Sequence, residues 1–320
     1  SQDASYTNAF IYRRQGAFDI APNGRLDEFN TVSKLRSYDL LFNYSNALSE
    51  NFDLDASFGL NRIESSFKQT VNTGETFVQE NFFSFNNFVS KNVSPALFRS
   101  KSNSVFATAT LGYKGFAYLE LSARNDWSST LPIDNASFFY PAVGASVVLS
   151  DAFPNIIEND VLSFLKLRGG YAKTGNATSP GRLQNTYNIS SSLYNNQLFY
   201  FLGSSEEGAG AGPSLNNPDL VAEISTNLEF GVDAKFFDNS LRFNATYYTV
   251  DTEDQILQLS LPPTTGANSQ FINAGLIRNS GIELTLSADI IKNDKFTWTS
   301  DLNFSKNNSK IVELSPEIDV

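Results

Sequence analysis

The chain has 320 residues, a formal net charge of −11, and neither histidine nor cysteine. The negative charge disfavours nucleic-acid binding, which depends on clustered lysine and arginine. The missing side chains exclude thiolate nucleophiles, Ser-His triads and imidazole or thiolate metal sites, so we expect no enzymatic activity, no metal and no cofactor. No apolar run approaches the roughly 20 residues of a membrane helix, whereas a membrane β-strand needs only about 9–11 residues.

Alternation of apolar and polar side chains is the main structural signal along the chain. The first 34 residues are irregular apart from a candidate strand at Asn8–Arg14, and beyond them period-two alternation predicts antiparallel strands. A helical interpretation fails because period 3.6 would scatter the apolar residues around the helix. The ten predicted strands span residues 35–48, 52–61, 105–113, 117–123, 138–149, 165–171, 224–236, 241–249, 282–290 and 296–304.

The connections between these strands alternate between short and long. Short turns are predicted at residues 49–51, 114–115, 238–239 and 292–295, and long connections at 65–100, 127–137, 175–222 and 253–278. Successive connections in an up-and-down antiparallel sheet lie at opposite ends, so one rim carries short turns and the other long loops. The connection at 150–161 departs from this rule, because it lies on the short-turn side but is long.

Strand length and rim asymmetry together predict an all-β fold, namely a segment of an antiparallel transmembrane β-barrel. The predicted strands, at roughly 11 to 14 residues, exceed the 5–6 residues usual in soluble proteins. Two alternatives remain open at this point. One is a soluble or surface-attached all-β binding or adhesion protein that buries its apolar faces between two sheets. The other is a passive porin.

Five motifs resemble a known family. They are ARNDWSSTLP (123–132), FFYPAVGASVVLS (138–150), LKLRGGYAKTGN (165–176), NNPDLVAEISTNLEFGVD (216–233) and LPPTTG through NAGLIRNSGIELTL (261–286). In this order they resemble the barrel of the SusC/RagA-like TonB-dependent transporters. The resemblance implies a 22-stranded outer-membrane barrel with an N-terminal plug and a SusD-like lipoprotein lid. It further implies import of an oligosaccharide or a peptide, energised by TonB–ExbB–ExbD through an N-terminal region.

The domain expectation follows from the strand count. We expect residues 1–320 to form one partial barrel domain, clearest at 35–64, 101–175 and 223–308, with the plug and the C-terminal strands outside this chain. An open half-barrel would leave unpaired strand edges in lipid, which is not viable. The sequence therefore predicts that the chain is part of a longer polypeptide.

Two sets of residues are candidates for contacts with partners. Aromatic residues in long connections are predicted to contact the substrate or the lid protein: Phe82, Phe83, Phe85, Tyr194, Phe199, Tyr200 and Phe201. Apolar residues on one strand face are predicted to contact lipid: Phe243, Leu284, Leu286 and Trp298.

Three other motifs suggest chemistry only superficially. The acidic group Asp251, Glu253 and Asp254 lacks calcium-loop spacing and is better interpreted as a solvated strand end. The adjacent Glu206 and Glu207 cannot readily take opposed roles across a sugar ring. The GAGAG segment (208–212) lacks the preceding strand and the following Lys-Ser/Thr of a phosphate-binding loop.

Overall fold

The fold is a single large antiparallel sheet, seen in a computed structural model that describes residues 2–12, 24–80, 82–154, 161–191, 198–202 and 214–314. Eleven of its twelve strands follow one another as antiparallel neighbours, and the short β10 pairs in parallel with β13. The strands of the sheet are β1 (Gln2–Tyr12), β2 (Arg25–Ser49), β3 (Phe52–Phe77), β4 (Phe88–Tyr113), β5 (Ala117–Ser128), β6 (Ser137–Val148), β7 (Leu162–Asn176), β10 (Ser214–Leu215), β11 (Glu223–Phe236), β12 (Leu241–Ser260), β13 (Ser269–Lys292) and β14 (Thr297–Glu313).

The remaining elements are short. A separate hairpin is formed by β8 (Tyr187–Ser191) and β9 (Leu198–Leu202). The described helical turns are η1 (Phe85–Asn87), η2 (Ile133–Asn135), α1 (Leu149–Ala152) and η3 (Pro263–Thr265). No helix within the described ranges is long and apolar enough to cross a membrane.

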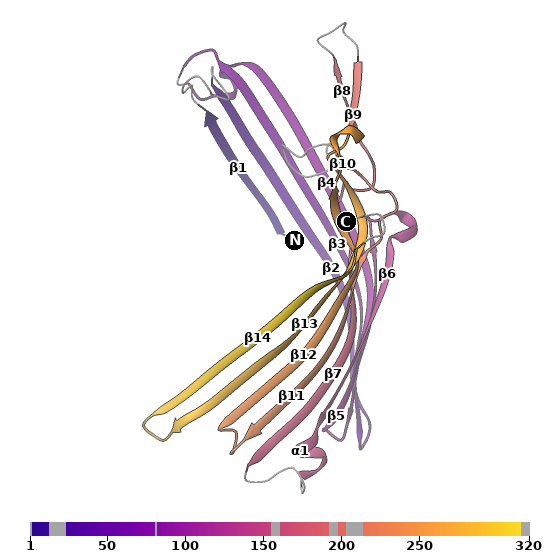
Figure 1. Cartoon of the computed structure of the whole chain (residues 1–320), viewed down its shortest axis with the longest axis vertical. Helices are drawn as coiled ribbons and strands as arrows, with labels where there is room; N and C mark the ends of the chain where they lie inside the picture. Colours follow the sequence, from indigo (N-terminus) through magenta and orange to yellow (C-terminus); the bar gives the residue numbers. More distant parts are fainter. Residues whose placement is uncertain are drawn as a thin grey trace.

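The sheet is curved and open, with β1 and β14 far apart at its two sides (Figure 1). Over the described residues, β1 pairs only with β2, and β14 pairs only with β13. The short turns and α1 lie at one end, and the β8–β9 hairpin lies at the other (Figure 1). The predicted fold class, a barrel segment with asymmetric rims, is confirmed.

All ten predicted strands are present, but several boundaries at the long-loop end are wrong. Strands β3 and β4 continue to Phe77 and from Phe88, and β12 and β13 continue to Ser260 and from Ser269. Most of the predicted connections at 65–100 and 253–278 is therefore strand. Above the apolar part of the wall both faces of these strands are largely polar, so alternation disappears while backbone pairing continues.

The short turns use residues that tolerate left-handed backbone conformations. Lys114 and Gly115 have φ values of 47° and 72°, as a two-residue type I′ turn requires. Asp238 and Asn239 have φ values of 51° and 65°. Asparagine and aspartate accept this region better than most residues, so the sequence fixes tight reversals at this rim.

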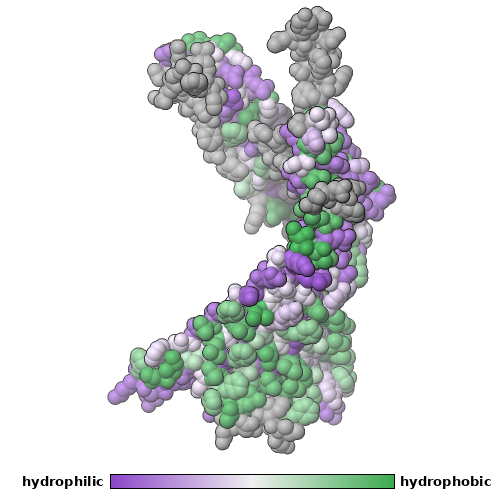
Figure 2. All heavy atoms as spheres, in the orientation of Figure 1, coloured by the Kyte–Doolittle hydropathy of each residue, from purple (hydrophilic) through white to green (hydrophobic). Residues whose placement is uncertain are grey.

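Strand register separates the side chains of the wall onto two faces. Phe42, Phe58 and Ala107 form one cross-strand row, and Phe230, Tyr247 and Ile282 form another. We call this side of the sheet the apolar face and the opposite side the polar face. Figure 2 shows hydrophobic residues gathered over the end of the molecule that carries the short turns.

Candidate functional site

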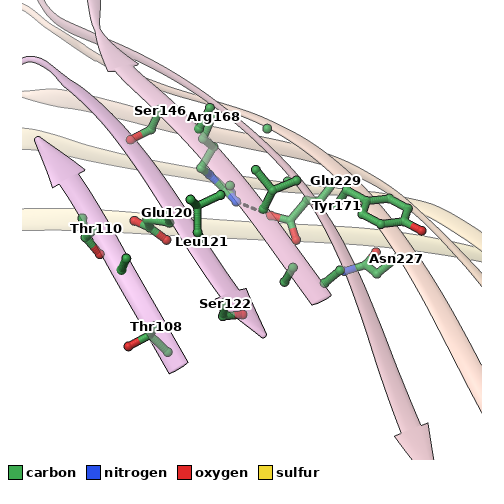
Figure 3. Close-up of a pocket in the computed structure, with 18 of the residues that line it drawn as sticks. Thr108, Thr110, Glu120, Leu121, Ser122, Ser146, Arg168, Tyr171, Asn227 and Glu229 are labelled. Carbon is green, nitrogen blue, oxygen red and sulfur yellow. Dashed lines mark hydrogen bonds and ion pairs between the residues drawn. The ribbon is translucent and has the colours of Figure 1, made fainter. Parts of the chain in front are cut away.

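A groove of about 440 Å³ crosses the polar face (Figure 3). Its floor is low because Gly144 and Gly170, which are register partners, have no side chains. Glu120 pairs with Gly144 on one side, and Glu229 pairs with Gly170 on the other. Hydroxyl, amide and charged groups complete its polar lining: Thr108, Thr110, Ser122, Ser146, Lys166, Arg168 and Asn227. Such a surface offers many hydrogen-bonding groups to a polar ligand.

Arg168 is the best-anchored charge of this groove. Its guanidinium forms an ion pair with Glu229, donates a hydrogen bond to the Thr246 hydroxyl at 2.5 Å, and lies 3.7 Å from an Asp233 carboxylate oxygen. Figure 3 shows the Arg168 and Glu229 side chains pointing toward one another from neighbouring strands. Two carboxylates thus surround one guanidinium, which holds the three strands β7, β11 and β12 together on the polar face.

Gly231 makes this arrangement possible, and enlarging it should disrupt the wall. A Cβ atom at Gly231 would lie 2.5 Å from Cζ of Arg168. We expect Gly231→Ala to displace the guanidinium and to lower the free energy of unfolding by about 1–3 kcal/mol. Denaturant unfolding of the protein in lipid vesicles measures the change.

Gly170 provides a matched control on the same face. A Cβ atom there would meet only the Val143 carbonyl oxygen, at an ordinary 3.8 Å. Gly170→Ala should therefore unfold close to the wild type. Equal losses in the two variants would contradict the role that we assign to Gly231.

The motifs that carry the family resemblance converge at the long-loop end. Leu131 of the ARNDWSSTLP motif, Leu220 and Ala222 of the NNPDLVAE motif, and Phe271 form a buried cluster. Leu220 is completely buried. Sequence analysis does not predict this cluster, because its members come from three segments that are distant along the chain.

Asparagine side chains tie the NNPDLVAE segment to the wall. The Asn273 amide accepts a hydrogen bond from Val221 N–H at 2.9 Å, and it donates to the Val221 and Asp254 carbonyls at 3.0 and 2.7 Å. The Asn216 amide donates to the Gly181 and Gln184 carbonyls. The predicted loop at 175–222 is thus a fixed strap that crosses to β13, where β10 pairs.

The predicted loop aromatics lie in two separate places on the long-loop rim (Figure 1). Phe82 is 57% exposed, Phe83 packs edge-on against Phe77, and Phe85 is half-buried in η1. The other four belong to the second place: Phe199, Tyr200 and Phe201 are in β9, which sequence analysis did not predict, and Tyr194 lies outside the described residues, as do those three side chains. Their contacts with a substrate or lid stay a prediction.

The residues predicted to contact lipid share the apolar face. Phe243 pairs with Leu286, Leu284 pairs with Phe304, and Trp298 lies on the same face of β14. Trp298 is 50% exposed, and Leu286 is also exposed.

The acidic candidate Asp251 has a cationic partner. Arg278 donates hydrogen bonds to both of its carboxylate oxygens, at 2.6 and 2.5 Å, and these bonds lower the pKa of Asp251. Within the described ranges, no group of three or more His, Cys, Asp or Glu residues is placed to hold a metal ion. Glu206, Glu207 and the GAGAG segment lie outside the described residues.

Comparisons with known proteins agree on one family. The family described as TonB dependent receptor-like, beta-barrel matches residues 1–314. The TonB-dependent receptor P3 of Formosa agariphila is 30% identical over 288 residues, which cover 85% of this chain and 28% of the relative. The TonB-dependent receptor SusC of Bacteroides thetaiotaomicron is 26% identical over 196 residues, which cover 60% of this chain and 19% of SusC.

Solved structures extend the likeness to the fold. The structure of the RagAB peptide transporter matches with a TM-score of 0.84 at 22% identity, over 98% of this chain and 34% of that chain. The chain thus spans about a third or less of the proteins that it matches.

Proposed function

Because this chain belongs to the TonB dependent receptor-like β-barrel family, we propose that it forms part of the wall of an outer-membrane nutrient importer. The observation that carries the proposal is the register of the ten long strands, which gathers apolar side chains on one face and polar side chains on the other. The complete protein would add a plug and further strands to close a 22-stranded barrel.

The two faces and two rims give the wall its orientation. Phe243, Leu284, Leu286 and Trp298 contact lipid, and the polar groove with Arg168 faces the lumen. The short turns lie on the periplasmic side and the long loops on the extracellular side. Energy for uptake comes from TonB–ExbB–ExbD acting on a region outside this chain.

The proposed cargo is an oligosaccharide or a peptide, received beneath a SusD-like lipoprotein lid. The hydroxyl- and carboxylate-lined groove suits a cargo rich in hydrogen-bonding groups. Exposed aromatics on the long-loop rim, Phe82 and Phe83 among them, provide surfaces on which sugar rings, peptide side chains or the lid can pack. The names SusC and RagAB peptide transporter, borne by similar proteins, support the two cargo classes.

Energy dependence tests the proposal against a passive porin. We expect cells that produce the complete protein to take up its oligosaccharide or peptide cargo, and we expect deletion of tonB or a protonophore to abolish uptake. Fluorescently labelled oligosaccharide and peptide pools measure the uptake, and affinity purification of the protein detects the lipoprotein lid. Uptake that persists without TonB would favour the porin. A complete protein that stays monodisperse in buffer without detergent would contradict both membrane functions.

A further inference from the structure

A basic cluster lies on the apolar face of the wall, just beyond the end of its apolar rows. On β2, β3 and β4, three consecutive rows climb from apolar to basic toward the long-loop rim. The rows are Leu40–Leu60–Val105, then Tyr38–Arg62–Asn103, then Arg36–Glu64–Lys101, and the next row adds Lys34 and Arg99. In a chain with a net charge of −11, five basic side chains against one carboxylate on three neighbouring strands form a local positive surface.

The height of this cluster matches the surface of a membrane. Leu40 and Arg36 are four residues apart on β2, which places the cluster about 13 Å along the strand from the apolar rows. Between them lie Tyr38 and Trp127, which is the register partner of Asn103, and both aromatic residues are exposed. Aromatic residues mark the membrane–water interface of outer-membrane barrels, so the basic cluster lies at the level of the lipid headgroups.

The basic groups are available to a ligand. Arg62 donates to Glu64 at 2.9 Å, and this bond, together with the positive charge of Lys101 and Arg36, lowers the pKa of Glu64. Over the described residues, none of the ion pairs includes Arg36, Arg99, Lys101 or Lys34. Asp3 of β1 is the register partner of Lys34, and so Lys34 is the least suited of the four to a test.

These side chains line a concave surface. A groove of about 470 Å³ is bounded by Lys34, Arg36, Glu64, Ser66, Arg99, Lys101 and Ser129. Ser129, from the connection after β5, fixes one wall, because its hydroxyl accepts from Lys101 N–H at 2.8 Å and its N–H donates to the Lys101 carbonyl at 2.9 Å. Arginine guanidinium groups match phosphate oxygens with paired hydrogen bonds, and serine hydroxyls add further donors.

We propose that this groove binds the phosphate groups of a lipid headgroup in the outer leaflet of the membrane. The inference rests on the membrane orientation given under Proposed function. The occupant is a lipid and not free phosphate, because the groove opens directly above apolar rows that would hold the acyl chains of the same molecule. A basic cluster beside a membrane surface attracts anionic lipid with each charge that it contributes.

Lipid binding to the complete protein in detergent tests the proposal. Native mass spectrometry counts bound diphosphoryl lipid A, with phosphatidylcholine and inorganic phosphate as separate arms. We expect wild type to retain lipid A, and we expect R36Q/R99Q/K101Q to bind it at least about tenfold more weakly. Phosphatidylcholine should not compete, and millimolar inorganic phosphate should displace little lipid A.

The variant K114Q/K292Q/K295Q is the matched control, because it removes three exposed charges from the opposite rim. It should bind lipid A like wild type. Equal weakening in both variants would show general charge attraction, and displacement by inorganic phosphate would show an anion site without a lipid; either result overturns the proposal. TonB-dependent uptake by R36Q/R99Q/K101Q cells keeps the two proposals apart, since lost uptake in wild-type cells as well would count against the importer and not against the groove alone.

Discussion

Replacing Leu284 by arginine should lower the free energy of unfolding of the barrel by about 2–4 kcal/mol, because the charge would face the middle of the hydrocarbon layer. Leu284 pairs with Ala245 on β12 and with Phe304 on β14, in the centre of the apolar rows of these strands. An arginine at the membrane midplane must leave water or deform the bilayer. Equilibrium unfolding in lipid vesicles measures the loss.

Thr285→Arg is the adjacent control, since Thr285 lies on the polar face, where its hydroxyl donates to the Asn303 side chain at 3.0 Å. It should cost much less than Leu284→Arg, because an arginine there remains in the wet lumen. A Thr285→Arg variant that is destabilised as much as Leu284→Arg would reverse the face assignment. Two neutral substitutions would show that neither face meets lipid.

The wall of the barrel could be predicted from sequence because its two faces have different solvents. Alternation between lipid-compatible and polar residues fixes the strands between the short turns, as at Phe230–Ala234, where every second residue is apolar. Above this level no lipid is present to select an apolar face. Residues 65–77 and 253–260 therefore lose the pattern, although they continue the same hydrogen-bonded ladder.

The polar groove could be predicted only in part. Arg168, Glu229 and Asp233 all stand at polar-face positions of predicted strands, so their orientation follows from the alternation. Their proximity does not, since β7 and β11 are register partners across the connection from 177 to 222. A one-residue slip of that register would separate Arg168 from Gly231, and no sequence feature fixes it without the three-dimensional pairing.

The same limit explains the strap. Asn216, Leu220 and Asn273 look like ordinary loop or strand residues in the sequence, yet they bring β7, β11 and β13 together at the long-loop rim. Buried asparagine amides that replace missing backbone partners give an irregular segment the satisfied hydrogen bonds it needs. The strap therefore positions the extracellular ends of three strands, which is where a cargo enters the proposed importer.

Leu220→Ala should consequently be the most damaging single truncation at this rim. Leu220 is fully buried against Leu131 and Phe271, and large-to-small substitutions at such sites cost about 2–5 kcal/mol. The membrane-spanning wall does not depend on this cluster, so we expect local opening of the strap before global unfolding. Hydrogen exchange of the amides in residues 214–222 should accelerate roughly 30-fold or more, which corresponds to at least about 2 kcal/mol.

Leu257→Ala separates burial from the mere loss of a leucine. Leu257 lies on β12 near the same rim but is 39% exposed, so its truncation should leave exchange in residues 214–222 close to wild type. If Leu220→Ala opens the strap, uptake of cargo should fall even though the barrel remains inserted, because the ends of β11 and β13 would no longer hold their relative positions. Unchanged exchange in the Leu220→Ala variant would mean that the asparagine hydrogen bonds, and not the buried cluster, hold the strap.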